Sequence, residues 1–280
     1  MNNKIGVLIN YRKDTDIKNE FLKAQSMGLE CCQISMWDTS MLTEEYSSAL
    51  SAALSETGFT VSAIWAGYSG GVKWNFTEGP LTIGLVPKEY RASRLEELKR
   101  ASDFAASLGI KRIITHVGFI PEDPNHPDFS GTVDALRELC GYLRERGQYF
   151  LFETGQETPV TMLRTIQAIG LDNIGINLDT ANLILYGKAN TLDALDVFGR
   201  YVMDTHIKDG VYPTDGLTLG REKRFGEGKA NFPAVVRKLH ELGYEGNFTI
   251  EREISGDEQI ADIILARDGL KRIMEGIADA

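Results

Sequence analysis

Short apolar runs alternate along this chain with longer segments in which apolar residues recur every three or four positions. A short apolar run bounded by polar residues is typical of a buried strand, and the three-to-four-residue period is typical of an amphipathic helix. The sequence contains eight such runs, each followed by a helical segment. The strands are expected at residues 4–11, 29–37, 59–67, 111–119, 148–155, 173–180, 201–210 and 246–253.

The helical segments lie between these runs. One is expected around residues 17–27, and a second begins after Thr43, which is a suitable N-cap. The later helices are expected at 89–108, 131–146, from about 159 onward, at 191–199, 232–242 and 257–276. Glycine, which commonly ends a helix in a left-handed conformation, follows several of them, at Gly28, Gly58, Gly109, Gly147, Gly170 and Gly243.

This alternation predicts an α/β fold with a parallel sheet, because parallel strands need crossover connections. Successive strands begin about 25–45 residues apart, which is close to the size of a βα unit. Eight units in 280 residues most simply close into a single (β/α)8 TIM barrel, with residues 1–280 forming one domain. An open doubly wound sheet is the alternative, but its GxGxxG fingerprint does not follow the first strand.

The composition narrows the function further. A net charge of −10 disfavours a nucleic-acid partner, because such a surface needs clustered Lys and Arg. Cys31, Cys32 and Cys140 are odd in number and two are adjacent, so they form no disulfide framework and fit a reducing cytoplasm. No apolar run approaches the roughly 18 residues that span a bilayer, and Ile5–Ile9 is too short for a signal-peptide core. We therefore expect a cytoplasmic protein without a membrane partner.

Four polar residues lie where the last four predicted strands end: Glu153, Asp179, His206 and Glu251. TIM-barrel enzymes have their active sites at this end of the strands, so the four side chains are expected to converge. Three converging carboxylates repel each other unless a cation neutralises them. The pattern predicts a divalent-metal site, with Mn²⁺ favoured and Mg²⁺, Co²⁺ or Zn²⁺ as alternatives. Polar residues also end strands without any catalytic role, although four at equivalent positions make that interpretation weaker.

The motifs around these residues are FETG, NLDTAN, DTHIKDG, FGEGKANF (225–232) and TIERE. In this order they resemble the xylose isomerase-like sugar isomerase/epimerase superfamily, whose members include ketose 3-epimerases and hydroxypyruvate isomerases. The resemblance extends along the whole chain. It implies that the four residues named above bind the metal and that Glu153 and Glu251 move protons on opposite faces of a metal-stabilised enediolate. Ketose 3-epimerases typically have His three residues after the metal aspartate, whereas this chain has Asn182, which can hydrogen-bond a sugar but not transfer a proton.

Other residues near the strand ends are candidates for substrate binding, beside Asn182. His116 ends the fourth strand, and a purely structural histidine is an equal alternative. Lys208 shares a strand face with His206 and could stabilise developing negative charge, unless it is an ordinary surface lysine. Trp65 is expected to stack on the C–H surface of a sugar.

The segment 221–229 is locally basic within an acidic protein and leads into a helix expected to be capped by Asn231. Helix N-termini attract anions, so Arg221 or Arg224 could bind a phosphorylated or carboxylated substrate. The alternative is that the glycines form a tight turn and one arginine contacts a substrate hydroxyl.

The function predicted from these features is a metal-dependent isomerase or epimerase of a small ketose, aldose or hydroxy-keto compound. The alternative on the same site is a lyase that dehydrates an inosose-like or dehydroshikimate-like substrate. An endonuclease-like hydrolase is disfavoured by the net charge and by only four histidines, and a non-catalytic sugar-binding barrel by the two glutamates. The expected partner is a small carbohydrate, and assembly into a homo-oligomer stays open.

Overall fold

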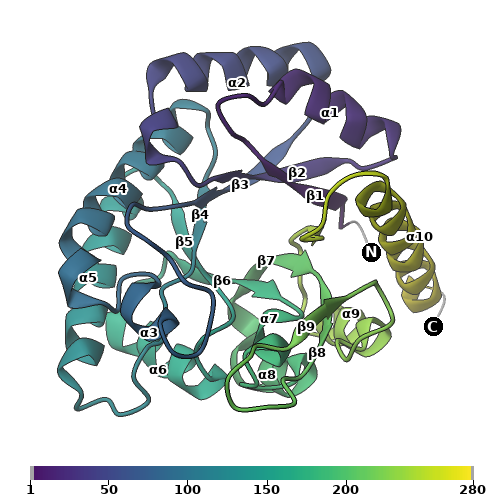
Figure 1. Cartoon of the computed structure of the whole chain (residues 1–280). Coiled ribbons are helices and arrows are strands. Elements are labelled where there is room, and N and C mark those ends of the chain that lie inside the picture. The colour runs from purple at the N-terminus through teal and green to yellow at the C-terminus, as the bar shows by residue number, and fades with distance from the viewer. Residues whose placement is uncertain (1–2, 279–280) are drawn as a thin grey trace.

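Eight parallel strands close into a barrel in the computed structural model, which describes residues 3–278 (Figure 1). Around the barrel the strands follow the order β1-β10-β7-β6-β5-β4-β3-β2. The predicted (β/α)8 TIM barrel is therefore confirmed. The barrel strands are β1 Ile5–Asn10, β2 Cys31–Met36, β3 Val61–Ala66, β4 Arg112–Thr115, β5 Tyr149–Glu153, β6 Ile174–Asp179, β7 Val202–Ile207 and β10 Phe248–Ile250.

Helices surround the barrel and connect successive strands (Figure 1). Two short 3₁₀ turns, Thr39–Met41 and Gly199–Tyr201, supplement them. No helix within residues 3–278 combines the length and apolar character that crossing a membrane requires. The helices are α1 Ile17–Ser26, α2 Glu44–Thr57, α3 Gly79–Thr82, α4 Lys88–Ser107, α5 Pro127–Arg144, α6 Pro159–Ile169, α7 Asn182–Leu185, α8 Thr191–Phe198, α9 Phe232–Glu241 and α10 Asp257–Ala278.

Each predicted strand segment contains an observed strand, but the ends differ. The segment expected at 201–210 is divided: β7 ends at Ile207, and β8 (Asp209–Val211) pairs antiparallel with β9 (Arg221–Lys223) in a separate hairpin. The six glycines expected after helices all adopt a left-handed backbone, with φ between 64° and 75°. Thr43 and Asn231 occupy the expected N-cap positions, but neither makes a side-chain hydrogen bond to its helix.

Side-chain alternation along the strands separates the hydrophobic core into two parts. Phe150 and Phe152 of β5 pack in the larger core between barrel and helices, whereas Leu151 packs inside the barrel with Trp65 and Ile114. Because alternate residues of a strand point to opposite faces, Glu153 lies on the same face as Leu151. The strand that buries two phenylalanines outside therefore directs its last carboxylate to the barrel interior.

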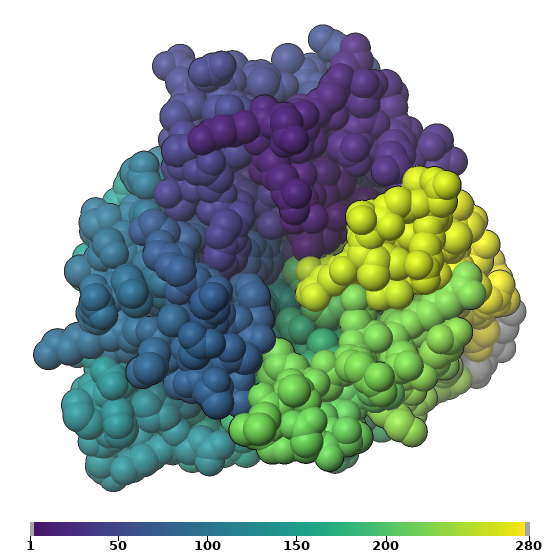
Figure 2. All heavy atoms as spheres, in the orientation of Figure 1, coloured from purple at the N-terminus to yellow at the C-terminus, as the bar shows by residue number. Residues whose placement is uncertain are grey.

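The connections that leave the carboxyl ends of the strands gather at one face of the barrel. The longest are residues 67–78, between β3 and α3, and residues 208–231, which contain the β8–β9 hairpin. Figure 2 shows a hollow at the centre of this face, surrounded by segments from the beginning, the middle and the end of the chain. We refer to this side as the carboxyl end of the barrel.

Candidate metal centre

Four side chains predicted to bind metal meet at the carboxyl end of the barrel. Glu153 ends β5, Asp179 ends β6, His206 lies in β7, and Glu251 follows β10. The register places Asp179 opposite His206 on neighbouring strands. One donor atom of each side chain lies within 4.8 Å of the corresponding atoms of the other three. We call these four residues the metal-ligand cluster.

The imidazole of His206 lies at the centre of the metal-ligand cluster. Its Nδ1 is 2.9 Å from Glu153 Oε1, 3.3 Å from Glu251 Oε2 and 3.9 Å from Asp179 Oδ2. Glu153, Asp179 and His206 are buried, and Glu251 is partly exposed. Three carboxylates at such distances, largely removed from water, repel each other strongly unless positive charge lies between them.

Two buried amides determine which nitrogen of His206 bears a proton. Asn177 Nδ2 donates to the Oε2 of Glu153, and Gln33 Nε2 donates to Asn177 Oδ1 at 3.0 Å. Gln33 Oε1 lies 2.7 Å from His206 Nε2. The carboxylate of Glu153 only accepts hydrogen bonds, so Asn177 must direct its NH₂ group at Glu153 and its carbonyl at Gln33. Gln33 must then direct its NH₂ group at Asn177 and its carbonyl at His206. The carbonyl of Gln33 therefore accepts from Nε2–H, which leaves Nδ1 as the ring nitrogen directed at the three carboxylates.

This arrangement fits a divalent cation. The buried Nδ1 of His206 and Oδ2 of Asp179 make no well-aligned hydrogen bond, although Glu153 Oε1 lies 2.9 Å from the first and Lys208 Nζ 3.0 Å from the second. An imidazole nitrogen and several carboxylate oxygens that converge on one point are typical of metal ligands. The hydrogen bond from the second ring nitrogen to Gln33 is the support that metal-binding imidazoles usually have.

Lys208 is the one basic side chain that contacts the metal-ligand cluster in the described residues. Its buried Nζ lies 3.0 Å from Asp179 Oδ2, 2.8 Å from Glu251 Oε2 and 2.8 Å from Glu253 Oε1. With Glu153, four carboxylates share this site with one ammonium group. When all of them are ionised and His206 is neutral, as a metal ligand must be, an excess of three negative charges remains, which a divalent cation would largely neutralise.

The pKa shifts follow from this charge distribution. Burial opposes the charged form of His206, but the carboxylates of Glu153 and Glu251 outweigh it and raise the pKa of His206 well above its usual value. Burial also disfavours ionised Glu251, yet Lys208 and His206 together hold the pKa of Glu251 well below its usual value. The same negative potential that attracts a proton to the imidazole would attract a metal ion.

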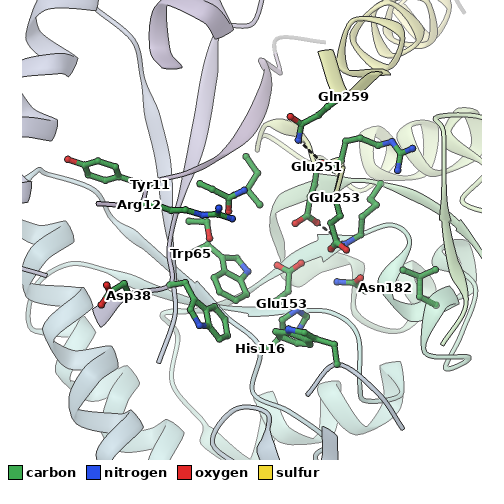
Figure 3. Close-up of a pocket in the computed structure, with 18 of the residues that line it drawn as sticks. Tyr11, Arg12, Asp38, Trp65, His116, Glu153, Asn182, Glu251, Glu253 and Gln259 are labelled. Atoms are coloured by element: carbon green, nitrogen blue, oxygen red, sulfur yellow. Dashed lines mark hydrogen bonds and ion pairs between the residues drawn. The ribbon is translucent and has the colours of Figure 1, made fainter. Parts of the chain in front are cut away.

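A cavity of about 820 Å³ opens above the metal-ligand cluster (Figure 3). Glu153 and Glu251 line it directly. Four of the six residues predicted to bind substrate also line it, and they come from different parts of the barrel: Trp65, His116, Asn182 and Lys208.

The other two predicted substrate residues, Arg221 and Arg224, do not line this cavity. Arg221 begins β9, and Arg224 Nε forms an ion pair with Asp262 of α10 at 2.7 Å. The prediction that one of them contacts the substrate stays untested, but both lie outside this cavity in the structure. The reason is local: the carboxylate of Asp209 accepts hydrogen bonds from the backbone of residues 226, 228 and 230, which folds this segment onto the β8–β9 hairpin.

His116 lies in the cavity with one nitrogen unused. Burial lowers the pKa of His116 to about 4, so its ring is neutral at pH 7. Its Nδ1 is buried and has no hydrogen-bond partner. The ring packs against the indoles of Trp74 and Trp65, with centroid distances of 5.1 and 5.8 Å. A neutral imidazole held in this way can hydrogen-bond a ligand.

Sequence reasoning missed several residues of the site. Gln33 and Asn177 are polar residues inside otherwise apolar strands, and Asn177 precedes Asp179 by two, which places both on one face. That spacing was a usable signal. Glu253, two residues after Glu251, had the same signal. Trp37 ends the strand expected at 29–37 and Trp74 lies in an expected loop, and only the folded chain brings both to the cavity.

This chain matches the model of a known protein family. Residues 21–275 match the model of the family described as xylose isomerase-like TIM barrel. An uncharacterised protein of Methanocaldococcus jannaschii is 25% identical over 197 residues, which make up 66% of this chain. The matched region spans about 64% of the length of that relative.

Solved structures share the fold along its whole length. A xylose isomerase domain protein from Planctomyces limnophilus is 34% identical, with a TM-score of 0.91 and 99% of each chain covered. L-ribulose 3-epimerase is 17% identical, with a TM-score of 0.74 and coverage of 99% of this chain and 96% of the other. A xylose isomerase-like TIM barrel protein from Mycobacterium smegmatis, solved in complex with magnesium, is 17% identical, with a TM-score of 0.72 and coverage of 99% and 98%. The last two similarities concern the fold alone.

Proposed function

Because this chain belongs to the xylose isomerase-like TIM barrel family, we propose that it is a metal-dependent sugar isomerase or epimerase. Its substrate would be a ketose, an aldose or a related hydroxy-keto compound. The observation that supports this most directly is the pair Glu153 and Glu251, which line one cavity beside a cluster of metal-binding donor atoms. Their strands, β5 and β10, are separated in the barrel by β6 and β7, so the two carboxylates approach the cavity from different directions (Figure 3).

The metal-ligand cluster would hold the divalent ion, with Mn²⁺ favoured and Mg²⁺, Co²⁺ or Zn²⁺ as alternatives. When bound, such an ion polarises a carbonyl and the neighbouring hydroxyl, which acidifies the carbon between them. The chain itself excludes water from the deepest part of the site, since Asp179 and His206 are buried. Low local polarity strengthens every charge interaction at the reacting carbon.

The two glutamates would move the proton. Glu153 is oriented by the hydrogen bond from Asn177 to its Oε2, and Glu251 by the ion pair with Lys208. The lowered pKa of Glu251 keeps this group ionised at neutral pH, as a general base must be. In an epimerisation, one glutamate removes the proton from one face of the carbon and the other returns a proton to the opposite face.

The remaining cavity residues would bind substrate oxygens. His116 is neutral and has a free nitrogen, and the Asn182 amide offers both a donor and an acceptor. Lys208, whose pKa is raised by Asp179, Glu251 and Glu253 against the opposing effect of burial, stays cationic. It would stabilise negative charge that develops on a substrate oxygen.

The test is deuterium exchange in D₂O with metal-loaded protein and a panel of C4–C6 ketoses, hydroxypyruvate and inososes. Incorporation of deuterium next to the carbonyl without loss of water is the expected result. Glu153→Gln and Glu251→Gln should each lower exchange at least a hundredfold, because a positioned acid or base typically contributes about 10²–10⁴ in rate. The control is Glu245→Gln, an exposed glutamate that precedes β10, which should not change exchange.

Two results would contradict the proposal. If both glutamine variants exchange deuterium as fast as the unaltered protein, the acid–base assignment is wrong. If a dehydrated product that absorbs in the ultraviolet accumulates instead, the reaction is that of a lyase.

A further inference from the structure

All three tryptophans of the chain line the cavity above the metal-ligand cluster. Trp37 follows β2, Trp65 lies in β3, and Trp74 lies in the connection after β3. Trp37 stacks on Trp65 with ring centroids 5.4 Å apart and planes inclined by 26°, and it meets Trp74 edge-on at 6.1 Å. We call these three residues the tryptophan cluster.

The members of the tryptophan cluster differ in exposure. Trp65 is only 8% exposed and packs on the apolar interior of the barrel, whereas Trp37 and Trp74 are 39% and 43% exposed. In Figure 3, Trp65 lies between Glu153 and the rim residue Asp38. The cavity therefore continues from the metal-ligand cluster past the buried indole to two indoles that are partly exposed.

The backbone is shaped to place Trp37 in this position. Gly67 follows β3, and a Cβ atom at Gly67 would lie 2.4 Å from the Cα of Trp37. Its backbone N–H donates to the carbonyl of Met36, directly before Trp37. Only a residue without a side chain allows the two segments to approach so closely. The stacking of Trp37 on Trp65 thus depends on a specific backbone contact.

The connection that contains Trp74 is anchored on both sides. The guanidinium of Arg94 is inside the protein, donates to the carbonyls of Gly84 at 2.7 Å and Ser69 at 3.1 Å, and stacks on the ring of Tyr68. The hydroxyl of Tyr68 accepts from the backbone N–H of Gly84 at 2.8 Å. These contacts join residues before and after Trp74, so its exposed ring is carried by a fixed segment rather than by a free loop.

The cavity above the metal-ligand cluster is larger than one sugar ring requires. Cavities that enclose drug-sized ligands measure about 300–1,000 Å³, and this cavity measures about 820 Å³. A monosaccharide whose reacting carbon lies at Glu153 and Glu251 would contact Trp65. The space over Trp37 and Trp74 would then stay empty, with two large apolar surfaces left in water at a cost in free energy.

We propose that Trp37 and Trp74 form an outer subsite for a second ring, so that the substrate is a glycosylated or aryl-substituted sugar rather than a free monosaccharide. The inference rests on the proposed function, which places the reacting sugar at the metal-ligand cluster. The apolar C–H face of a pyranose, or the face of an aromatic group, packs on the indoles. The side chains of Asn10, Arg12 and Asp38, which also line the cavity, supply hydrogen-bonding groups for ring hydroxyls.

Binding can be measured without turnover, since every tryptophan reports on this cavity. The probes are fructose and lactulose, a ketose of the same kind that bears a β-linked galactosyl ring, titrated by tryptophan fluorescence and by calorimetry into Mg²⁺-loaded protein. Lactulose should bind at least tenfold more tightly than fructose, which corresponds to about 1.4 kcal/mol. Phenyl β-glucoside against methyl β-glucoside tests an aromatic second ring in the same way, and the pair with the larger difference identifies the preferred substituent.

The variant Trp37→Ala/Trp74→Ala should bring the dissociation constants of lactulose and fructose, measured by calorimetry, within twofold of each other. Trp37→Phe/Trp74→Phe should restore part of it. Trp74→Ala alone serves if the double variant is unstable, because Trp74 is half-exposed and outside the barrel strands. Tyr149→Ala is the control, since Tyr149 is similarly exposed (37%) but begins β5 at the opposite end of the barrel.

The proposal is overturned if both ligands of each pair bind within twofold of each other, if neither binds, or if the difference persists in the double alanine variant. These results are independent of the deuterium experiment. If free ketoses exchange deuterium but a second ring is not preferred, the proposed isomerase activity stands and the proposed outer subsite is wrong. If a second ring is preferred but no deuterium is exchanged, the proposed outer subsite stands and the proposed isomerase activity is wrong.

Discussion

The interior of the barrel holds buried carboxylates at both ends, and the two ends neutralise them differently. Near the amino end, Asp204 of β7 is fully buried and pairs with Arg112 of β4 at 3.2 Å. These strands are not neighbours, so the ion pair crosses the barrel interior. At the carboxyl end, His206 of the same strand faces three carboxylates with Lys208 as their basic partner.

The difference separates a structural charge from a functional one. Asp204 has one acid matched by one base, and although burial raises its pKa, Arg112 opposes that shift. In the metal-ligand cluster the acidic side chains outnumber the basic ones, and the Nδ1 nitrogen of His206 makes no well-aligned hydrogen bond. A closed ion pair needs nothing else, whereas an unbalanced group of donors needs a bound cation.

Removal of metal from the carboxyl end should have the largest effect. Treatment with EDTA should lower turnover at least a thousandfold, because the metal supplies several kcal/mol of charge stabilisation in the transition state. It should also lower the melting temperature by about 5 °C, because a ligand that binds only the folded state stabilises it. Activity measurements and calorimetry before and after addition of Mn²⁺ check both effects. Full activity in rigorously metal-free protein would contradict the distinction between a closed ion pair at the amino end and a metal site at the carboxyl end.

Breaking the ion pair at the amino end should destabilise the fold without changing the site. Arg112→Met leaves Asp204 buried and unpaired, and we expect a loss of about 3–5 kcal/mol in the free energy of unfolding. Denaturant unfolding measures this loss. In the double variant Arg112→Met/Asp204→Asn most of the stability should return. Metal affinity should be the same in all three proteins, and a weakened affinity would show that the two ends are coupled.

Glu157 offers a third way to bury a carboxyl group, namely as the protonated acid. Both side-chain oxygens are buried without a side-chain partner, and burial raises the pKa of Glu157 to about 8 against the opposing effect of the nearby backbone N–H groups. The unfolded chain loses this proton near pH 4.5 and the folded protein only near pH 8, so stability falls as the pH rises between these values. At pH 7 the loss is about 3 kcal/mol.

The variant Glu157→Gln removes this ionisation and keeps the shape of the side chain. It should be more stable than the unaltered protein at pH 7 and equal to it at pH 4, measured by thermal unfolding across this range. The exposed Glu245→Gln should show no such dependence. Equal stability of Glu157→Gln and the unaltered protein at all pH values would mean that the carboxyl group is solvated or paired in solution.

The smallest expected effect concerns the amide that supports His206. Gln33→Met should weaken metal binding about 10- to 100-fold, because groups that hydrogen-bond a metal-binding imidazole typically contribute that much. Nitrogen-15 NMR of the histidines should also lose the signature of an Nε2-protonated ring. Gln148→Met is the matched control, since Gln148 is also buried and hydrogen-bonded but lies away from the metal-ligand cluster. Equal metal affinity in both variants would remove the supporting role of Gln33.

Much of the candidate site could be predicted because strand periodicity is local. Glu153, Asp179 and Glu251 each end an apolar run, and parallel strands bring such ends together whatever the details of packing. The placement of Arg221 and Arg224 could not be predicted in this way. Their segment has no strand period, and its path is determined by hydrogen bonds from its backbone to Asp209.

The sequence by itself determined the alternation of strands and helices, the closed barrel and the four donors of the metal-ligand cluster. These follow from local hydrophobic periods and from the geometry of parallel strands. Only the tertiary structure decided the support of His206 by Gln33, 173 residues away, and the meeting of Trp37 and Trp74 at one cavity. Such contacts join distant segments through specific backbone paths, and no local pattern of polar and apolar residues encodes those paths.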